Sequence, residues 1–229
     1  MNPLDIEVWG LKLRLLPRGN ISEEKLYTAP QLFDPEEFRL MRRMLKPGSI
    51  FVDVGANAGI YSFWASRCMD GQGRIIAIEP DPEMARRIRF NVATNKLDCI
   101  ELSQVGLSDH EGTATLRVNP QQRGTNSLEA SPCAESSEDT VRTEVPVVTL
   151  VHLLQSGGVS SIDMLKIDIE GHEEVVLSQF FRNAPENQWP KLIISEFKHT
   201  GEDRVVTLLS RHGYRQRQTT RLNIILERA

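Results

Sequence analysis

A short apolar segment that runs into a glycine-containing turn constrains the fold of this chain more than any other feature. Ile50-Phe51-Val52-Asp53-Val54 is apolar and β-branched, which is typical of a buried strand, and Gly55-Ala56-Asn57-Ala58-Gly59 follows it directly. Residues 60–69 then have the period of a helix. A strand that turns through glycines into a helix is typical of open α/β sheets, which bind ligands beyond the carboxyl ends of their strands.

Apolar runs of this kind alternate with segments of helical period along most of the chain. The alternation predicts an α/β fold whose mostly parallel sheet of about seven strands is covered by helices on both faces. The last two strands are close enough in sequence to form a hairpin. The expected strands are 50–54, 74–79, 100–104, 162–168, 192–197, 214–218 and 222–227, and the expected helices are 60–69, 82–95, 150–155, 173–180 and 203–212.

Two segments depart from this alternation. Residues 1–47 predict an N-terminal extension with a strand at 11–16 and a helix that begins at Asp34-Pro35-Glu36-Glu37, where Asp34 caps the helix and Glu37 completes a capping box. Residues 113–118 and 144–148 alternate as antiparallel strands do, and residues 119–143 are polar, so we expect an inserted hairpin with a mobile lid. Nothing indicates a domain boundary, and we expect residues 1–229 to form a single domain.

Charge and cysteine content narrow the class of partner. Lys and Arg number 27 against 31 Asp and Glu, which gives a net charge of -4 and no basic surface for nucleic acid. Three cysteines without metal-ligand spacing favour reduced thiols in the cytoplasm. We expect no export signal in the first residues and no membrane span, since a span needs about 20 apolar residues in a row.

Two ligands compete for the glycine turn: a dinucleotide and S-adenosylmethionine. A dinucleotide turn needs further glycines where this chain has Asn57 and Ile60. A carboxylate at Asp53 would repel a pyrophosphate and attract the ammonium and sulfonium groups of S-adenosylmethionine. Glu79 ends the next strand, where it can accept hydrogen bonds from ribose hydroxyls, and Pro80 fixes the turn after it. The predicted cofactor-binding residues are Asp53, Gly55, Asn57, Gly59, Glu79, Pro80 and Asp168.

The two main motifs resemble those of a known family. Asp53-Val54-Gly55-Ala56-Asn57-Ala58-Gly59 resembles the first cofactor motif of class I S-adenosylmethionine-dependent methyltransferases, and residues 162–173 resemble the signature of the FkbM family within that class. Shorter segments at 33–37, 105–109, 126–128 and 223–226 are also similar to that family. The resemblance implies a Rossmann-like sheet of seven strands with a reversed last strand. It also implies methyl transfer, usually to oxygen, with acceptors often found on sugars or secondary metabolites.

The fourth predicted strand carries the candidate catalytic groups. Side chains alternate along a strand, so Lys166, Asp168 and Glu170 are expected on one face, with Lys166 and Asp168 as a charged pair. Orientation of the reactants can contribute about 7–11 kcal/mol, whereas a general base contributes about 10²–10⁴ in rate. We predict Asp168 as the base. It ends the strand at 162–168, which we expect to lie next to the strand at 50–54 and so close to the methyl group. The other candidates are Glu170, His172 and Glu196, with Lys166 as the partner of Asp168.

Several alternatives remain at this point. The pair Lys166 and Asp168 could orient the site without touching a reactant, and residues 170–173 could simply begin a helix. Asp168, Glu170 and Glu196 could bind Mg²⁺ if they converge, but we predict no metal. We predict an S-adenosylmethionine-dependent methyltransferase that acts on a hydroxyl of a small molecule, sugar or secondary metabolite. The alternatives are a catalytically silent S-adenosylmethionine-binding subunit or sensor and an NAD-dependent oxidoreductase.

Overall fold

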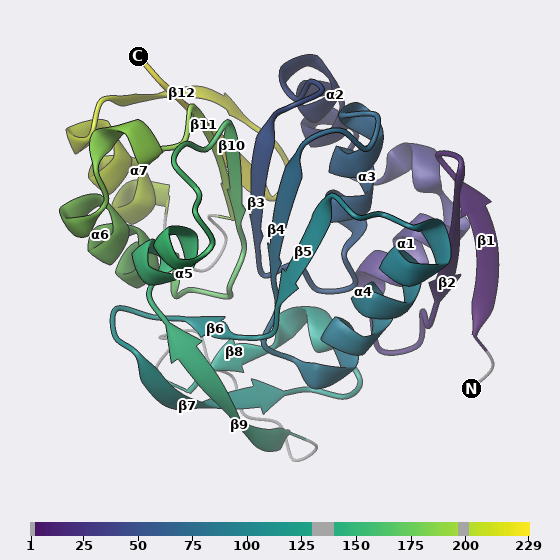
Figure 1. Ribbon diagram of the computed structural model, residues 1–229. Helices are drawn as coiled ribbons and strands as arrows, with labels where there is room; N and C mark the ends of the chain where they lie inside the picture. The colour runs from purple at the N-terminus through teal and green to yellow at the C-terminus, as the bar shows by residue number, and fades with distance from the viewer. Residues whose placement is uncertain (1–2, 130–139, 197–201) are drawn as a thin grey trace.

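A seven-stranded sheet forms the centre of the structure, a computed structural model that describes residues 3–129, 140–196 and 202–229 (Figure 1). The strand order is β12-β13-β11-β10-β3-β4-β5, and β13 is antiparallel to both of its neighbours, while the pairs from β11 to β5 are all parallel. The prediction of about seven strands with a reversed last strand is therefore confirmed. The strands are β3 (Ile50–Val54), β4 (Arg74–Ile78), β5 (Ile100–Ser103), β10 (Met164–Ile167), β11 (Leu192–Glu196), β12 (Tyr214–Thr219) and β13 (Asn223–Arg228).

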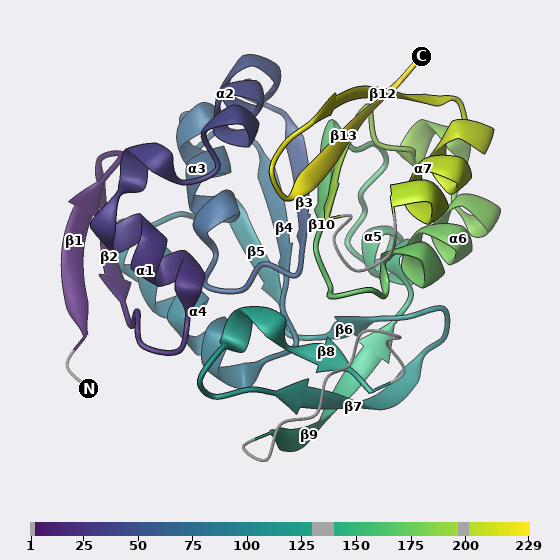
Figure 2. The ribbon, with the colours of Figure 1, turned by 180° about the vertical axis from the view of Figure 1, so that it is seen from behind.

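Helices cover both faces of this sheet, which explains why its strands are apolar runs rather than alternating ones. Phe51 and Ile75 pack on one face under α2 (Pro35–Met44), α3 (Ile60–Cys68) and α4 (Pro82–Asn95). Val52 and Ile76 pack on the other face under α5 (Leu150–Ser156), α6 (Glu173–Asn183) and α7 (Glu202–Arg211). The two views show one helical layer on each side of the sheet (Figures 1 and 2). A short 3₁₀ turn, η3 (Glu186–Gln188), precedes β11.

The N-terminal segment is more regular than expected. Besides the predicted strand β2 (Leu11–Leu15), it contains β1 (Leu4–Val8), which pairs with β2 antiparallel, α1 (Ile21–Thr28) and the 3₁₀ turn η1 (Pro30–Leu32). Asn20 caps α1, because its side-chain oxygen accepts a hydrogen bond from the Glu23 amide at 3.2 Å. Leu26 packs into the main core and β2 packs against α4, so the segment is docked on the domain rather than extended into solvent.

The predicted capping box at the start of α2 is wrong. The backbone of Asp34 lies in the left-handed region, with φ at 34°, and its side chain caps no amide. Its carboxylate instead accepts a hydrogen bond from the Tyr61 hydroxyl at 2.8 Å. Glu37 accepts hydrogen bonds from Thr220 and Asn223 at 2.5 and 2.7 Å. Tertiary partners therefore take both carboxylates that the local pattern assigned to the helix terminus.

A second sheet lies across the carboxyl ends of the central strands (Figure 1). Its order is β6-β9-β7-β8, and β7 pairs antiparallel with both β8 and β9, as the predicted hairpin requires. The lid predicted at 119–143 is corrected in part, because 119–129 contain η2 and β8 and residues 141–143 already belong to β9; residues 130–139 lie outside the described residues. The elements are β6 (Gly106–Leu107), β7 (Gly112–Val118), η2 (Arg123–Thr125), β8 (Ser127–Leu128) and β9 (Val141–Val148).

The helices that the structure describes include none with the length and apolar character needed to cross a membrane.

Candidate functional site

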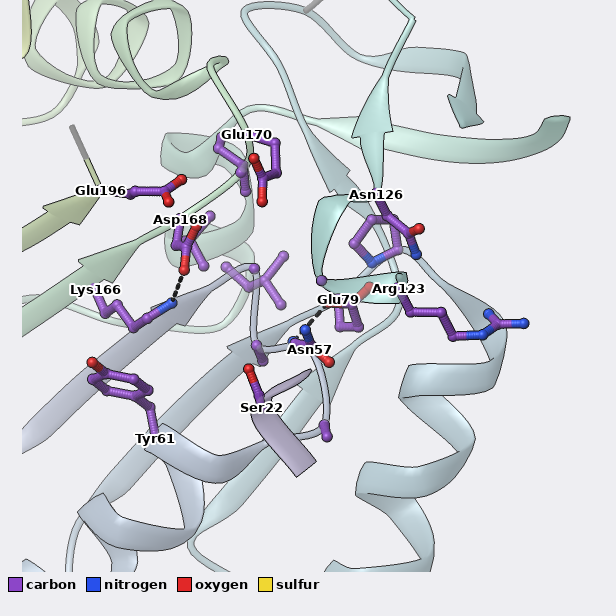
Figure 3. Close-up of a pocket in the computed structure, with 18 of the residues that line it drawn as sticks. Ser22, Asn57, Tyr61, Glu79, Arg123, Asn126, Lys166, Asp168, Glu170 and Glu196 are labelled. Carbon is purple, nitrogen blue, oxygen red and sulfur yellow. Dashed lines mark hydrogen bonds and ion pairs between the residues drawn. The ribbon is translucent and has the colours of Figure 1, made fainter. Parts of the chain in front are cut away.

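A cavity of about 1180 Å³, including its open mouth, lies where β3, β4 and β10 end. The glycine turn forms its floor, η2 and β8 form one wall, and the N-terminal segment from α1 to Asp34 forms another. Figure 3 shows that the polar side chains of the cavity come from these separate elements.

Gly55 brings two strand ends together at this floor. Its φ is 75°, and a Cβ atom there would lie 1.9 Å from the carbonyl oxygen of Asp168, so no other residue fits without moving the backbone. The amides of Gly55 and Ala56 both donate to the Ile78 carbonyl at 3.0 Å, which ties the turn to β4. Gly59 lies outside the residues that line the cavity. Its Cβ would meet Phe63 and Ile88 at 3.1 Å, which corrects its predicted role from cofactor contact to helix packing.

Glu79 and Pro80 line the cavity as expected. The Glu79 carboxylate accepts hydrogen bonds from the backbone amides of Asn57 and Asp81, both at 2.8 Å. Burial raises the pKa of Glu79 to about 7, against the effect of these hydrogen bonds. The side chain is therefore held in one orientation at the wall of the cavity, next to the glycine turn.

Asp53 does not face the cavity, and its predicted contact with the ligand is wrong. Its side chain is 0% exposed, lies outside the lining residues and accepts a hydrogen bond from the Ser62 hydroxyl at 2.7 Å. In the sheet it lies opposite Lys166. Burial raises the pKa of Asp53, and the charge of Lys166 opposes that rise. Asp53 therefore supports Lys166 from below instead of touching a ligand.

Lys166 and Asp168 form the predicted charged pair, with Lys166 Nζ 3.1 Å from Asp168 Oδ2. The ammonium also lies 4.9 Å from the centre of the Tyr61 ring, which is within the range of a cation–π contact. Burial alone would lower the pKa of Lys166, but the carboxylates of Asp168 and Asp53 raise it. The Asp168 side chain remains 36% exposed, so a ligand in the cavity can reach it.

Three carboxylates converge at the end of the cavity near β10 and β11. Asp168, Glu170 and Glu196 each have an oxygen within 4.8 Å of the others, and Figure 3 shows them facing one another. Burial, followed by the charges of Asp168 and Glu170, raises the pKa of Glu196 to about 9. Oxygen ligands at this spacing suit a hard cation such as Mg²⁺, and this is the one such group among the described residues.

The segment from Glu170 to Glu173 both contributes to the cavity and begins helix α6. Glu170 lines the cavity, whereas Glu173 accepts hydrogen bonds from the amides of Ile169 and Gly171 at 2.8 and 3.3 Å and so fixes the turn before α6. His172 lines the cavity but is only 4% exposed, and its Nε2 lies 3.4 Å from the Ser108 hydroxyl. Burial lowers its pKa. His172 is thus less accessible to an acceptor than Asp168.

Backbone strain gathers at the cavity. Six described residues other than glycine have positive φ, and three of them line the cavity: Asp34 at 34°, Asn57 at 51° and Glu170 at 54°. Such conformations cost about 1–3 kcal/mol each and persist where the surrounding structure enforces them, often at functional sites. Their placement supports the cavity as the functional site.

Several lining residues escaped the sequence analysis. Tyr61, Ser22 and Lys25 line the cavity, and burial raises the pKa of Tyr61 well above its ordinary value. No local pattern marks them, because tertiary contacts bring α1 and α3 to the site.

Arg123 of the predicted lid pairs with Asp81 at 2.6 Å. Asn126, also on that segment, donates to the same carboxylate at 2.8 Å.

Comparison with known sequences identifies a family for most of the chain. The methyltransferase FkbM domain matches residues 53–216. Methyltransferase sdnD of Sordaria araneosa is 28% identical over 63% of this chain and 64% of its own length. The 31-O-demethyl-FK506 methyltransferase FkbM of Streptomyces tacrolimicus is 25% identical over 74% of each chain. The hexuronic acid methyltransferase AglP of Haloferax volcanii is 27% identical over 77% of this chain and 67% of its own. The chain thus spans between 64% and 74% of the length of these relatives.

Solved structures share the fold at low identity. A precorrin-6y C5,15-methyltransferase from Geobacter metallireducens superposes with a TM-score of 0.53 at 16% identity, covering 85% of this chain and 88% of its own. A methyltransferase from Geobacter sulfurreducens gives 0.50 at 18% identity, covering 86% and 77%. These likenesses support the Rossmann-like arrangement and carry no argument about substrate.

Proposed function

Because the chain belongs to the family of methyltransferase FkbM domains, we propose that it transfers the methyl group of S-adenosylmethionine to a hydroxyl of a small molecule, sugar or secondary metabolite. The observation that carries this proposal is the placement of Glu79 and the pair Lys166 and Asp168 around one cavity at adjacent strand ends. Two relatives support an oxygen-rich acceptor by their names, one as a 31-O-demethyl-FK506 methyltransferase and one as a hexuronic acid methyltransferase.

The acidic groups of the cavity fit a positively charged nucleoside. Glu79 presents a carboxylate for ribose hydroxyls, and Asp168, Glu170 and Glu196 add carboxylates at the other end. A dinucleotide would bring its anionic pyrophosphate into this acidic surface, which disfavours the oxidoreductase alternative. When bound, S-adenosylmethionine supplies an activated methyl group on a cationic sulfur. The residues proposed to hold it are Gly55, Asn57, Glu79, Pro80 and Asp168.

Asp168 is proposed as the general base. It would accept the proton of the acceptor hydroxyl, and Lys166 holds the carboxylate in place at 3.1 Å. Glu196, whose pKa is raised to about 9, keeps its proton at neutral pH and so does not compete as a base. Tyr61 likewise stays protonated and donates to Asp34 at 2.8 Å. Orientation of the acceptor by these groups supplies most of the rate gain.

The proposal extends to the class of acceptor, the domain organisation and the location of the protein. A net charge of -4 supports a small molecule or glycan acceptor rather than nucleic acid. We also propose that the chain acts as a single domain in the cytoplasm. The accessible Asp168 carboxylate favours an enzyme over a silent cofactor-binding subunit, because a purely binding role needs no base at the acceptor end.

A labelling experiment tests the proposal. The protein is incubated with S-adenosylmethionine that carries an isotopic methyl label and with fractions of a cell extract, and labelled products are identified by mass spectrometry. We expect label in an ether linkage of a small molecule or glycan, and none with heat-denatured protein. Cofactor binding without any labelled product would instead support the silent subunit.

A further inference from the structure

Helix α1 brings a serine and a lysine to the cavity from outside the matched domain. Ser22 and Lys25 are three residues apart, which places them on the same side of a helix, and both line the cavity. Figure 3 shows the Ser22 hydroxyl directed toward the cavity, on the opposite side from Glu170 and Glu196. The match to the family domain begins at residue 53, so both residues precede the matched segment.

Polar anchors hold this face of α1 against the glycine turn. The Asn20 side chain caps α1 and also donates to the Asn57 side-chain oxygen at 2.6 Å. One turn further, Glu23 is fully buried and forms an ion pair with the buried Arg87 of α4. The Gly19 carbonyl accepts from the Arg123 amide at 2.8 Å. Breaking a buried pair of this kind is strongly destabilising, so α1 keeps a fixed position beside the turn.

Of the lysine and arginine side chains among the described residues that line the cavity, two are paired with carboxylates and one is not. Arg123 pairs with Asp81 at 2.6 Å and Lys166 with Asp168 at 3.1 Å. Within the described residues, Lys25 has no carboxylate at ion-pair distance, although its charge lowers the pKa of Asp34 against the larger effect of burial. The Asp34 carboxylate is already occupied by the Tyr61 hydroxyl. Lys25 is therefore positioned to meet an anionic group that enters the cavity.

We propose that Ser22 and Lys25 form a carboxylate-binding subsite for the amino-acid end of S-adenosylmethionine. This assignment rests on the proposed function, which places the ribose at Glu79 and the methyl group toward Asp168. The amino-acid end then has the remaining direction, along the glycine turn toward α1. Its carboxylate meets the Lys25 ammonium and the Ser22 hydroxyl, while the acidic groups of the cavity face the cationic sulfur.

Calorimetry with ligands that differ in the carboxylate tests the subsite. Lys25→Met should weaken S-adenosylhomocysteine about tenfold, which is the lower range for a hydrogen bond to a charged group at a partly exposed site. It should leave 5′-methylthioadenosine, which has no amino-acid end, unchanged. Ser22→Ala should show the same selectivity with a smaller loss. Lys12→Met, an exposed lysine on β2 outside the cavity, is the matched control.

A charge reversal gives a second, independent readout. Lys25→Glu should weaken S-adenosylhomocysteine further and bind decarboxylated S-adenosylmethionine at least as well as the unmodified protein does. Equal losses for all ligands in either variant, or an unchanged affinity for S-adenosylhomocysteine, would overturn the subsite. An unchanged cofactor affinity with a raised KM for an acidic acceptor would move the carboxylate to the acceptor and overturn it as well. Failure of the unmodified, folded protein to bind S-adenosylhomocysteine would overturn the proposed function itself.

Discussion

Lys166 lies opposite Asp53 in the register of the parallel strands β10 and β3, and both side chains are buried. A lysine in the middle of a sheet is costly unless carboxylates surround it. Asp53 provides one beneath it and Asp168 provides another at the cavity. The charge of Asp53 therefore favours the ammonium form of Lys166, which pairs with the proposed base. This places Asp53 in support of the site rather than in contact with the ligand.

Replacement of the proposed base should separate turnover from binding. Asp168→Asn keeps the shape of the side chain but removes the proton acceptor, so we expect turnover to fall about 10²–10⁴-fold. Calorimetry should show a change of only a few-fold, about 1 kcal/mol or less, in the affinity for S-adenosylhomocysteine. The exposed Asp98→Asn serves as the control. Turnover equal to that of the control would remove Asp168 from this role.

Cofactor affinity should depend on pH through Glu79. The ionised carboxylate is the form that accepts hydrogen bonds from ribose hydroxyls, and its pKa is raised to about 7 by burial. As the pH falls below this value the carboxylate must first release a proton, so affinity should drop by up to about tenfold per pH unit. Calorimetry from about pH 8 to about pH 5.5 measures this slope.

Glu79→Gln removes the titrating group and should give a weaker affinity that no longer varies with pH in this range. In the unmodified protein the backbone amides of Asn57 and Asp81 donate hydrogen bonds to the Glu79 carboxylate and hold the turn. Thermal melting of the variant checks that the protein remains folded without that carboxylate. The same slope in both proteins would show that another group titrates.

Part of this site could be read from the sequence and part could not. The glycine turn, Glu79 and the pair of Lys166 and Asp168 follow from strand ends and from alternation along a strand, which are local properties. Asp53 was misplaced because a residue at a strand end can point into the core as well as into the cavity. The buried ion pair that positions α1 joins Glu23 to Arg87, which lies far along the chain, so no local pattern marks Ser22 and Lys25 as lining residues.

The predicted lid at residues 119–143 also could not be read correctly from local composition. Its polar composition predicts a loop without regular structure, yet β8 pairs with β7 and Asp81 binds both Arg123 and Asn126. These contacts replace the solvent that a polar segment ordinarily faces. The seven-stranded sheet was easier to predict, because burial on both faces imposes apolar runs that are visible in one dimension.

Glu196 should lower stability as the pH rises. Its pKa is raised from 4.5 to about 9, so in this range the folded state keeps a proton that the unfolded state releases. Folding then binds a proton, and the free energy of unfolding falls as the pH rises through this window and is unaffected below it. Glu196→Gln removes this dependence. In urea unfolding, its gain over the unmodified protein should be larger at about pH 8 than at about pH 5.

Glu24→Gln, at an exposed position on α1, controls for the loss of one charge. A gain from Glu196→Gln that is the same at both pH values would contradict the raised pKa.

The pair of Arg123 and Asp81 should govern release of the cofactor. Arg123 lines the cavity from η2, and its 2.6 Å ion pair to Asp81 ties that wall to the start of α4. Arg123→Met should speed dissociation of S-adenosylhomocysteine by about threefold to tenfold in stopped-flow experiments, as expected for loss of a largely buried ion pair at the cavity wall. Arg142→Met, which breaks an exposed pair with Glu129, should leave the rate unchanged. Equal rates in the two variants would show that η2 does not restrain the ligand.

Calorimetry of the unmodified protein with S-adenosylmethionine, S-adenosylhomocysteine and NAD tests most directly whether this cavity holds a cationic sulfur nucleoside. We predict that S-adenosylmethionine and S-adenosylhomocysteine bind at the same single site and that Glu79→Gln weakens the binding of both. NAD should give no heat of binding. Binding of NAD without either methyl-cofactor form would contradict the account.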